Sequence, residues 1–288
     1  MTMPDATRQD ASQIAAARAT FRRLHESGCF VIPNPWDTGT ALMLKHLGFK
    51  ALATTSSGFS FSRGLPDTDW AVPRDMALGH IAEIVGATDL PVNADFESGY
   101  AHEPEAVAEN CRLCAATGVA GLSIEDNSGK PGEPLYAFDL AVERIKAAVS
   151  ALKGTGVLLT ARSEAHLFGV PDAQKVAVKR LVAFAEAGAD VLYAPGLRTP
   201  EQIREVVAAV APKPVNLLLS GPIGISVADA AAFGVRRVSV GSALARAAWG
   251  GFLKSARELA GQGTFNSLAE AEPFAALNTF FRTHGPKA

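Results

Sequence analysis

Short apolar runs alternate with longer amphipathic stretches along most of the chain. Eight runs of about five residues are rich in Leu, Val and Ala and end in small or polar residues: Val31–Pro35, Ala51–Ser56, Pro91–Phe96, Gly121–Asp126, Val157–Arg162, Val191–Gly196, Pro214–Leu219 and Arg237–Ser242. Parallel strands that are buried on both faces have this composition. The runs therefore predict eight buried strands.

The stretches between the runs have a helical period. In the segment 199–211 the apolar residues fall on one face of a helix: Ile203, Val206, Val207 and Val210. Thr199 followed by Pro200 is a typical helix start, with an N-cap and a proline in the first turn. Glycines suited to ending helices stand just before several predicted strands: Gly48, Gly118, Gly188 and Gly234.

Eight strand–helix units predict an α/β fold, a (β/α)8 TIM barrel that forms a single domain over residues 1–288. A doubly wound open sheet is the alternative, but the chain has no G-x-G-x-x-G turn to support it. Two amphipathic helices are predicted outside the eight units, at 8–27 and 267–283. The second has a face formed by Phe274, Leu277, Phe280 and Phe281, which predicts packing on its own barrel or contact with another subunit.

Composition narrows the class of partner. The chain is 48% hydrophobic, which allows a large core, and 27 Lys and Arg against 29 Asp and Glu leave a net charge of -2. This balance gives no electrostatic reason to expect nucleic acid or an acidic membrane as partner. No run approaches the ~20 apolar residues of a membrane span, the first residues lack an apolar signal segment, and three cysteines make no disulfide framework. We expect a soluble, cytoplasmic protein.

Charged residues gather where the predicted strands end. Active sites of TIM barrels lie at the carboxyl ends of the strands. Asp95 and Glu97 follow the third strand and are two residues apart, so both side chains are expected to point the same way. Glu125 ends the fourth strand, Arg162 ends the fifth, and Asp67 lies in the loop after the second. Several carboxylates are thus expected at the mouth of the barrel.

Crowded carboxylates repel one another, and a divalent cation relieves that repulsion. Oxygen ligands without a cluster of His or Cys favour Mg²⁺ or Mn²⁺ over Zn²⁺. Neutralisation by Arg162 and lysines alone is the alternative. A bound metal would polarise a 2-oxo acid and stabilise an enolate, while Arg162 would pair with a carboxylate or phosphonate of the substrate.

Six segments resemble, in order, motifs of the isocitrate lyase/phosphoenolpyruvate mutase superfamily. They lie within residues 20–250 and are Asn34–Asp37, Thr55–Gly58, Gly64–Asp67, Asp95–Tyr100, Gly121–Asp126 and Thr160–Arg162. The D-x-[DE]-x-G-[YF] segment and the I-E-D strand end that follows it are specific as a pair.

The resemblance implies a barrel whose last helix, 267–283, is exchanged between subunits of a homodimer or homotetramer. It implies a Mg²⁺ site around Asp95, to which Asp67, Glu97 and Glu125 contribute directly or through water. It further implies that Ser57, Gly58, Phe59, Arg162 and Asn216 bind the substrate. Arg162, Glu125 and Asp67 are the catalytic candidates.

The chain also departs from the family pattern. Isocitrate-type lyases carry a Lys-Lys/Arg-Cys-Gly-His loop after the fourth strand, whose Cys donates a proton. Here the segment 127–138 contains neither Cys nor His. It also lacks the Lys-x-Asn pair of the mutases, and Pro195 stands where the lyases have a glutamate. These departures disfavour cleavage of isocitrate-type substrates and mutase activity.

Three functions therefore compete. The first is a Mg²⁺-dependent lyase that cleaves a C–C or C–P bond of a small 2-oxo acid through a metal-stabilised enolate, for example by decarboxylating an oxaloacetate-like substrate. The second is a phosphoenolpyruvate or phosphonopyruvate mutase or hydrolase. The third is a barrel that binds a metabolite without turnover.

Other polar or reactive residues have simpler interpretations. Cys111 and Cys114 are predicted to pack in the core. Asp37 is predicted to cap the following helix. Gly241-Ser242, at the start of the last barrel helix, is a possible phosphate site, with a tight turn as the favoured alternative. His166 is expected at the surface or behind the site.

Overall fold

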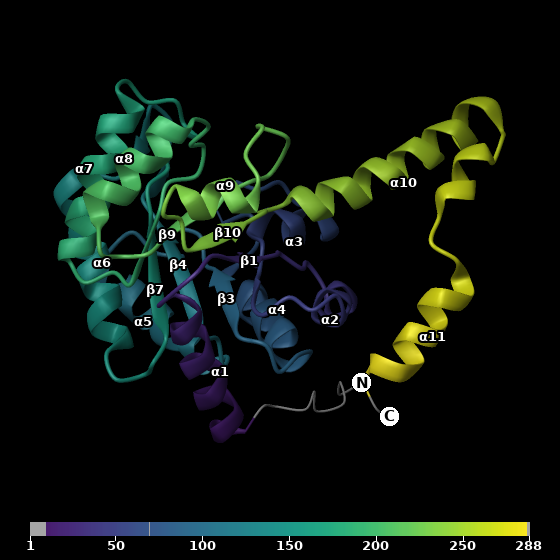
Figure 1. Cartoon of the computed structure of the whole chain (residues 1–288), viewed down its shortest axis with the longest axis horizontal. Helices are drawn as coiled ribbons and strands as arrows, with labels where there is room; N and C mark the ends of the chain where they lie inside the picture. The colour runs from purple at the N-terminus through teal and green to yellow at the C-terminus, as the bar shows by residue number, and fades with distance from the viewer. Residues whose placement is uncertain (1–9, 69, 287–288) are drawn as a thin grey trace.

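Eight parallel strands make up the main sheet of the computed structural model, which describes residues 10–68 and 70–286. Their hydrogen-bonded order is β1-β10-β9-β8-β7-β4-β3-β2 (Figure 1). The strands are β1 (Phe30–Ile32), β2 (Leu52–Ala53), β3 (Val92–Asp95), β4 (Gly121–Glu125), β7 (Leu158–Arg162), β8 (Val191–Tyr193), β9 (Val215–Leu218) and β10 (Arg237–Ser239). Seven of them lie within a predicted run, and β1 begins one residue before the run Val31–Pro35.

The first and last strands of this order meet and close the barrel. The Ala53 N–H donates to the Pro33 carbonyl at 3.0 Å, and the Asn34 amide donates to the Thr54 carbonyl at 2.9 Å. The open-sheet alternative is therefore excluded, and the predicted (β/α)8 barrel is confirmed. Closure brings the carboxyl ends of all eight strands to one mouth.

Helices surround the barrel. They are α2 (Thr38–His46), α3 (Ser56–Ser62), α4 (Arg74–Gly86), α5 (Pro104–Ala116), α6 (Phe138–Leu152), α7 (Ala173–Glu186), α8 (Pro200–Val210) and α9 (Val227–Ala232). Asp37 accepts from the Thr40 N–H at 2.7 Å and caps α2 as predicted. No helix in the described ranges is long and apolar enough to cross a bilayer.

The amino-terminal helix α1 (Ala11–Leu24) covers the floor of the barrel. It is shorter than the predicted 8–27, because Asp10 caps it and it ends at Leu24; residues 8 and 9 lie outside the described residues. Phe21 is fully buried in one cluster with Ile32, Ala120 and Leu158 from the strands. The cluster closes the amino-terminal end of the barrel and leaves the end with the carboxyl termini of the strands open.

The segment after β4 contains a hairpin that the sequence analysis did not predict. β5 (Asn127–Lys130) pairs antiparallel with β6 (Glu133–Leu135). Gly132 turns between them with a φ of +82°, a conformation that glycine adopts without strain. The hairpin occupies the place of the Cys-bearing loop of the lyases.

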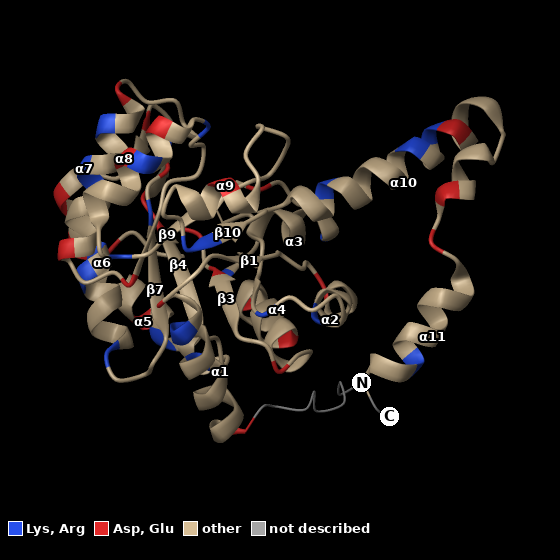
Figure 2. Ribbon diagram, in the orientation of Figure 1, with Lys and Arg blue, Asp and Glu red and all other residues tan. Residues whose placement is uncertain are grey.

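The carboxyl-terminal arm, residues 243–286, begins with α10 (Ala243–Gln262), which extends away from the barrel (Figure 1). Its last helix returns to α2, where the Phe280 and His46 ring centroids are 5.2 Å apart. The predicted helix 267–283 is wrong in its boundaries, since a short 3-10 helix η1 (Asn266–Glu270) precedes α11 (Phe274–His284). Proline is poorly compatible with a helix interior, and Pro273 stands directly before α11. No residue of α11 is buried, and Phe274 is 84% exposed. Figure 2 shows long uncharged stretches along α10 and α11.

Gly121 gives a test of the barrel packing. A Cβ added there would lie 2.7 Å from the Phe21 ring and 2.8 Å from Asn93 Oδ1. Gly121→Ala should therefore lower the free energy of unfolding by about 1–3 kcal/mol. Gly79→Ala, in α4 with nothing within 4 Å of the added Cβ, is the matched control and should raise it by about 0.5–1 kcal/mol. Urea unfolding measures both, and an unchanged midpoint for Gly121→Ala would contradict the close approach of α1.

Candidate active site

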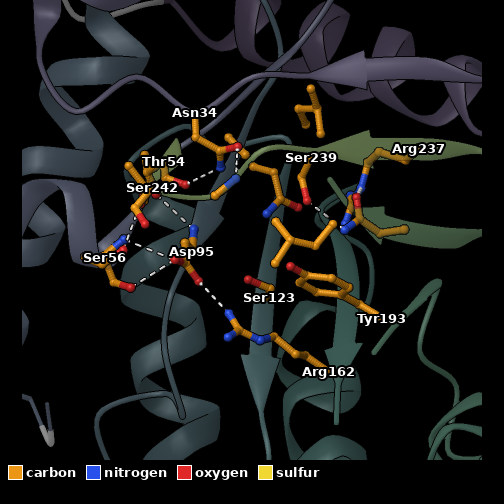
Figure 3. Close-up of a pocket in the computed structure, with 18 of the residues that line it drawn as sticks. Asn34, Thr54, Ser56, Asp95, Ser123, Arg162, Tyr193, Arg237, Ser239 and Ser242 are labelled. Atoms are coloured by element: carbon orange, nitrogen blue, oxygen red, sulfur yellow. Dashed lines mark hydrogen bonds and ion pairs between the residues drawn. The ribbon is translucent and has the colours of Figure 1, made fainter. Parts of the chain in front are cut away.

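A cavity of about 210 Å³ runs from the mouth of the barrel into its interior (Figure 3). Polar side chains dominate its wall: Asn34, Thr54, Ser56, Ser57, Asp67, Asn93, Asp95, Ser123, Arg162, Tyr193, Asn216, Arg237, Ser239 and Ser242. The interior of a TIM barrel is ordinarily filled by branched apolar side chains. A polar, hollow interior is therefore the principal candidate for a binding site.

Strand register places several of these polar groups in one row. Glu125, Arg162, Tyr193, Asn216 and Arg237 are successive Cα partners across five neighbouring strands. Glu125 is the last residue of β4, whereas Arg237 is the first residue of β10. Barrel strands are staggered, so the row descends from the mouth toward the floor.

Arg162 lies among three carboxylates. Its Nη1 is 3.1 Å from Glu125 Oε2 and 3.5 Å from Asp95 Oδ1, and its Nε and Nη2 both donate to Glu164. Burial alone would lower the pKa of Arg162, but the charges of Glu125 and Glu164 outweigh burial and hold this pKa above its ordinary value. The positive charge of Arg162 is thus more than offset by its neighbours.

Asp95 is fixed by the start of α3 (Figure 3). Its Oδ2 accepts from the N–H and the hydroxyl of Ser56, both at 3.0 Å, while its N–H donates to Thr54 Oγ1 at 2.9 Å. Asp67 lines the same cavity and is exposed. Partial desolvation raises the pKa of Asp67, and the charge of Asp95 adds to the rise.

Glu97 does not lie where strand alternation places it. β3 ends at Asp95, and Glu97 has a φ of +47°, so the two-residue period does not extend to it. The Tyr100 hydroxyl donates to Glu97 Oε1 at 2.8 Å. Burial raises the pKa of Glu97 to about 7, and the charges of Asp95 and Asp67 contribute to the rise. Glu97 lines a neighbouring cavity with Trp70, Ser98, His102 and Lys130.

The acidic residues of the mouth influence one another. Burial raises the pKa of Glu125 well above its ordinary value, and the nearby charges of Glu164, Asp95 and Glu97 act in the same direction. In the described residues, however, no group of three or more His, Cys, Asp or Glu is close enough to hold a metal ion directly. An oxygen-only set with excess negative charge fits Mg²⁺, which usually keeps several water ligands.

Of the three consecutive residues that were predicted to bind substrate, Ser57, Gly58 and Phe59, one faces the cavity and two do not. Ser57 lines the cavity. The Gly58 N–H donates to Thr55 Oγ1 at 3.2 Å, and the Phe59 N–H donates to the Thr55 carbonyl at 3.1 Å, so both are engaged in the first turn of α3. The Phe59 ring stacks on His80, with ring centroids 3.8 Å apart. Only Ser57 of the three faces the cavity directly.

Asn216 faces the cavity and is held at both ends of its amide. Its Nδ2 donates to Ser239 Oγ at 2.9 Å, and its Oδ1 accepts from Arg237 Nε at 2.8 Å. Arg237 and Glu164 are site residues that the sequence analysis missed. The signal for Arg237 was a charge at the start of an apolar strand, and the signal for Glu164 was its spacing of two residues from Arg162.

Several other candidates have structural roles. Asp126 is buried away from the cavity, where its carboxylate accepts from Arg180 Nη1 at 3.2 Å and from the Glu164 N–H at 2.8 Å. The Gly241 N–H donates to Asn34 Oδ1 at 2.9 Å, so this proposed phosphate ligand already has an acceptor. Elsewhere, Cys111 and Cys114 are fully buried in α5, as predicted.

Comparison with known proteins gives a consistent assignment. Residues 21–260 match the model of the phosphoenolpyruvate phosphomutase family. A solved structure of a lyase- or mutase-like protein from Burkholderia cenocepacia is 47% identical, covers 94% of this chain and 97% of its own, and superposes with a TM-score of 0.89.

Two further relatives have named activities. The oxaloacetate decarboxylase of Paraburkholderia xenovorans is 31% identical over 230 residues, which are 76% of this chain and 73% of that protein. A structure of oxaloacetate acetylhydrolase in complex with its product oxalate is 28% identical, with a TM-score of 0.80 and coverage of 93% of this chain and 94% of the other. The match to superfamily structures agrees with the barrel described above.

The raised pKa of Glu97 predicts a pH-dependent stability. Between its ordinary pKa of 4.5 and about 7, the folded protein binds a proton that the unfolded chain has lost. Stability of the cation-free protein should therefore fall as pH rises through this window, by up to about 1.4 kcal/mol per pH unit for this group. Glu97→Gln should make the slope shallower.

Urea unfolding in chelator at several pH values from about 5 to about 8 measures this slope. Glu133→Gln, in the exposed part of the hairpin, is the control and should retain the wild-type slope. Equal slopes for Glu97→Gln and wild type would show that Glu97 is not buried among the acidic residues of the mouth.

Proposed function

We propose a specific chemistry for this chain, which belongs to the phosphoenolpyruvate phosphomutase family and is an enzyme of the isocitrate lyase/phosphoenolpyruvate mutase superfamily. It is a Mg²⁺- or Mn²⁺-dependent lyase that cleaves a C–C bond one carbon removed from the carbonyl of a small 2-oxo acid, with an oxaloacetate-like substrate as the leading candidate. Relatives in this superfamily are enzymes, and this disfavours the alternative of a barrel that binds a metabolite without turning it over.

One observation carries the proposal. Asp95 is fixed by Ser56 and faces the guanidinium of Arg162, 3.5 Å away, on the wall of a polar cavity at the barrel mouth. Both oxygens of this carboxylate have a partner, but an ionised carboxylate has about four lone-pair positions, so an oriented carboxylate of this kind is still suited to a hard cation. A fixed arginine beside it is suited to an acidic substrate.

The residues present fit a divalent cation. We place Asp95 as its central protein ligand, with Asp67, Glu97 and Glu125 acting directly or through water. When bound, the ion supplies a Lewis acid that polarises the 2-oxo group of the substrate. Burial raises the pKa values of Asp67, Glu97 and Glu125, and neighbouring carboxylates add to the rise. This supports the placement, because a cation stabilises the ionised form of crowded carboxylates.

The remaining residues bind and orient the substrate. Ser57, at the start of α3, donates a hydrogen bond from its hydroxyl to the carboxylate next to the 2-oxo group, while Gly58 and Phe59 hold the first turn of α3 in place through their hydrogen bonds to Thr55. Arg162 donates to the substrate, and Glu125 holds the guanidinium in position from 3.1 Å. Asn216 contacts the substrate from the opposite wall. When the bond between C3 and the C4 carboxylate breaks, CO2 leaves and the electron pair of the bond moves toward the C2 carbonyl to give an enolate, which takes a proton from solvent at C3.

The hairpin argues against cleavage of isocitrate-type substrates. β5 and β6 stand where isocitrate-type lyases have their Cys-bearing loop, and the segment 127–135 supplies no thiol. Decarboxylation of a 2-oxo acid needs no such group to break the bond. C–P bond chemistry is the second candidate, because the matched family model is that of a phosphomutase.

We also propose that the active form is a homodimer or homotetramer that exchanges its carboxyl-terminal arms. Trp249 and Phe252 on α10 are 39% and 58% exposed, and Phe274 on α11 is 84% exposed. Large apolar side chains gathered on one arm favour burial against a second copy of the chain. Apart from subunits, the expected partner is a small 2-oxo carboxylate or phosphonate.

Calorimetric titration with oxalate, a mimic of the pyruvate enolate, tests the proposed function. Oxalate should bind in the presence of Mg²⁺ and lose binding in chelator, and the Mg²⁺-loaded enzyme should convert oxaloacetate to pyruvate. Asp95→Ala should abolish the Mg²⁺-dependent binding. Asp75→Ala, an exposed carboxylate on α4, is the matched control and should leave it intact. Equal oxalate affinity with and without Mg²⁺, or in Asp95→Ala, would contradict the proposed metal site.

Deletion of residues 265–288 tests the exchanged arm. The full-length protein should have the molar mass of a dimer or tetramer by light scattering. The shortened chain should form a smaller oligomer or a monomer, because the apolar contact between subunits is removed. Leu47→Ser, which changes an apolar side chain that is 65% exposed on the barrel itself, should not alter the mass. An unchanged oligomer after the deletion would rule out the arm as the subunit contact.

A further inference from the structure

Two arginines line the active-site cavity, and their surroundings differ sharply. Arg162 contacts three carboxylates. Arg237, which is only 3% exposed, donates from Nε to Asn216 Oδ1 at 2.8 Å and from Nη2 to Thr160 Oγ1 at 3.1 Å. Within the ranges that the structure describes, no carboxylate lies within ion-pairing distance of Arg237.

The third partner of Arg237 is neutral as well. His25 Nε2 lies 3.4 Å from Arg237 Nη1, while His25 Nδ1 lies 2.8 Å from the Phe21 carbonyl. The proton of the neutral ring therefore belongs on Nδ1, which leaves Nε2 as an acceptor. Burial, aided by the charge of Arg237, lowers the pKa of His25 to about 3, so the ring carries no charge near neutral pH.

A buried guanidinium with only neutral partners is an unusual arrangement. Buried charges are ordinarily paired, because desolvation of an isolated ion is costly. Burial lowers the pKa of Arg237 only to about 10, so it remains a cation near neutral pH. The structure thus holds a positive charge on the cavity wall for which the chain supplies no counter-ion among its described residues.

Arg237 has N–H donors that are not used by its three contacts, and the cavity beside it is large enough for a ligand. A guanidinium carries five N–H donors, and the three contacts above leave two without a partner in the described part of the protein. At about 210 Å³, the cavity is several times the ~30 Å³ that one water occupies in the liquid.

The two ends of the cavity therefore carry charges of opposite sign. The mouth carries an excess of carboxylates around Arg162, and the interior carries the unpaired cation. We propose that Arg237 and Asn216 form an anion subsite inside the barrel, which binds a second carboxylate of the substrate while the 2-oxo end lies near Asp95. This inference rests on the proposed function and narrows it to 2-oxo dicarboxylates over monocarboxylates.

Malate and lactate make a suitable pair of probes, because both are 2-hydroxy acids and only malate has a second carboxylate. Their affinities for the Mg²⁺-loaded enzyme are measured by displacement of oxalate in calorimetric titrations. In wild type, malate should bind roughly tenfold to hundredfold more tightly than lactate, as expected for a charge-assisted hydrogen bond. Equal affinities in wild type would overturn the subsite without any variant.

Arg237→Met should remove the preference for malate and leave the affinities for oxalate and lactate near the wild-type values. Arg237→Lys, which keeps the charge but loses the planar fork, should keep part of the preference. Arg236→Met is the matched control, because this neighbouring arginine binds the Gly28 carbonyl and does not line the cavity. It should retain the full preference.

A retained preference for malate in Arg237→Met would overturn the inference. If Arg237→Met does not fold, the preference in wild type and its partial loss in Arg237→Lys still decide the question. Failure of oxalate to bind the Mg²⁺-loaded wild type would instead contradict the proposed function, so the two failures are distinguishable.

Discussion

The balance of charge around Arg162 is the constraint on which the site depends. Arg162 contacts Asp95, Glu125 and Glu164, and its charge opposes the desolvation that raises the pKa values of Glu125 and Glu164. The contact between Arg162 and Glu125 follows from the register of β4 and β7, in which the two residues are direct partners. Any shift of this register would separate them.

The surrounding framework protects that register. Asp126, next to Glu125 in sequence, is anchored by Arg180 and by the backbone of Glu164, so one buried carboxylate ties the end of β4 to the segment after β7. Asp95 is held by Ser56 from α3. These hydrogen bonds hold Asp95 and the backbone of Glu164 in place, and preorganised groups of this kind stabilise developing charge with little rearrangement.

Much of the fold could be predicted from the sequence, because buried parallel strands and amphipathic helices have distinct apolar periods. All eight strands and the cap at Asp37 were predicted. The hairpin at 127–135 was not, because its short strands carry few apolar residues. The interruption between η1 and α11 was not predicted, although Pro273 marks it. The apolar face of 274–281 led to a single predicted helix that began seven residues too early, at residue 267.

The candidate site was predicted in part for similar reasons. Asp95, Glu125 and Arg162 end strands, where alternation fixes the direction of a side chain. Glu97 and Glu164 lie beyond strand ends, so sequence alone does not fix their directions. Arg237 was missed because a charge inside a barrel is recognisable only once its register partners are known. Its neighbours Asn216 and His25 come from positions far apart in the sequence.

Diffraction from crystals grown with Mn²⁺ and oxalate tests the central claim most directly, because the anomalous signal of manganese locates the ion independently of any assumed ligand. The account predicts a single strong peak within coordination distance of Asp95 and of oxalate oxygens, with Ser57 beside the ligand. A peak remote from Asp95, or oxalate bound at the mouth without manganese, would contradict the proposed role of the acidic cluster.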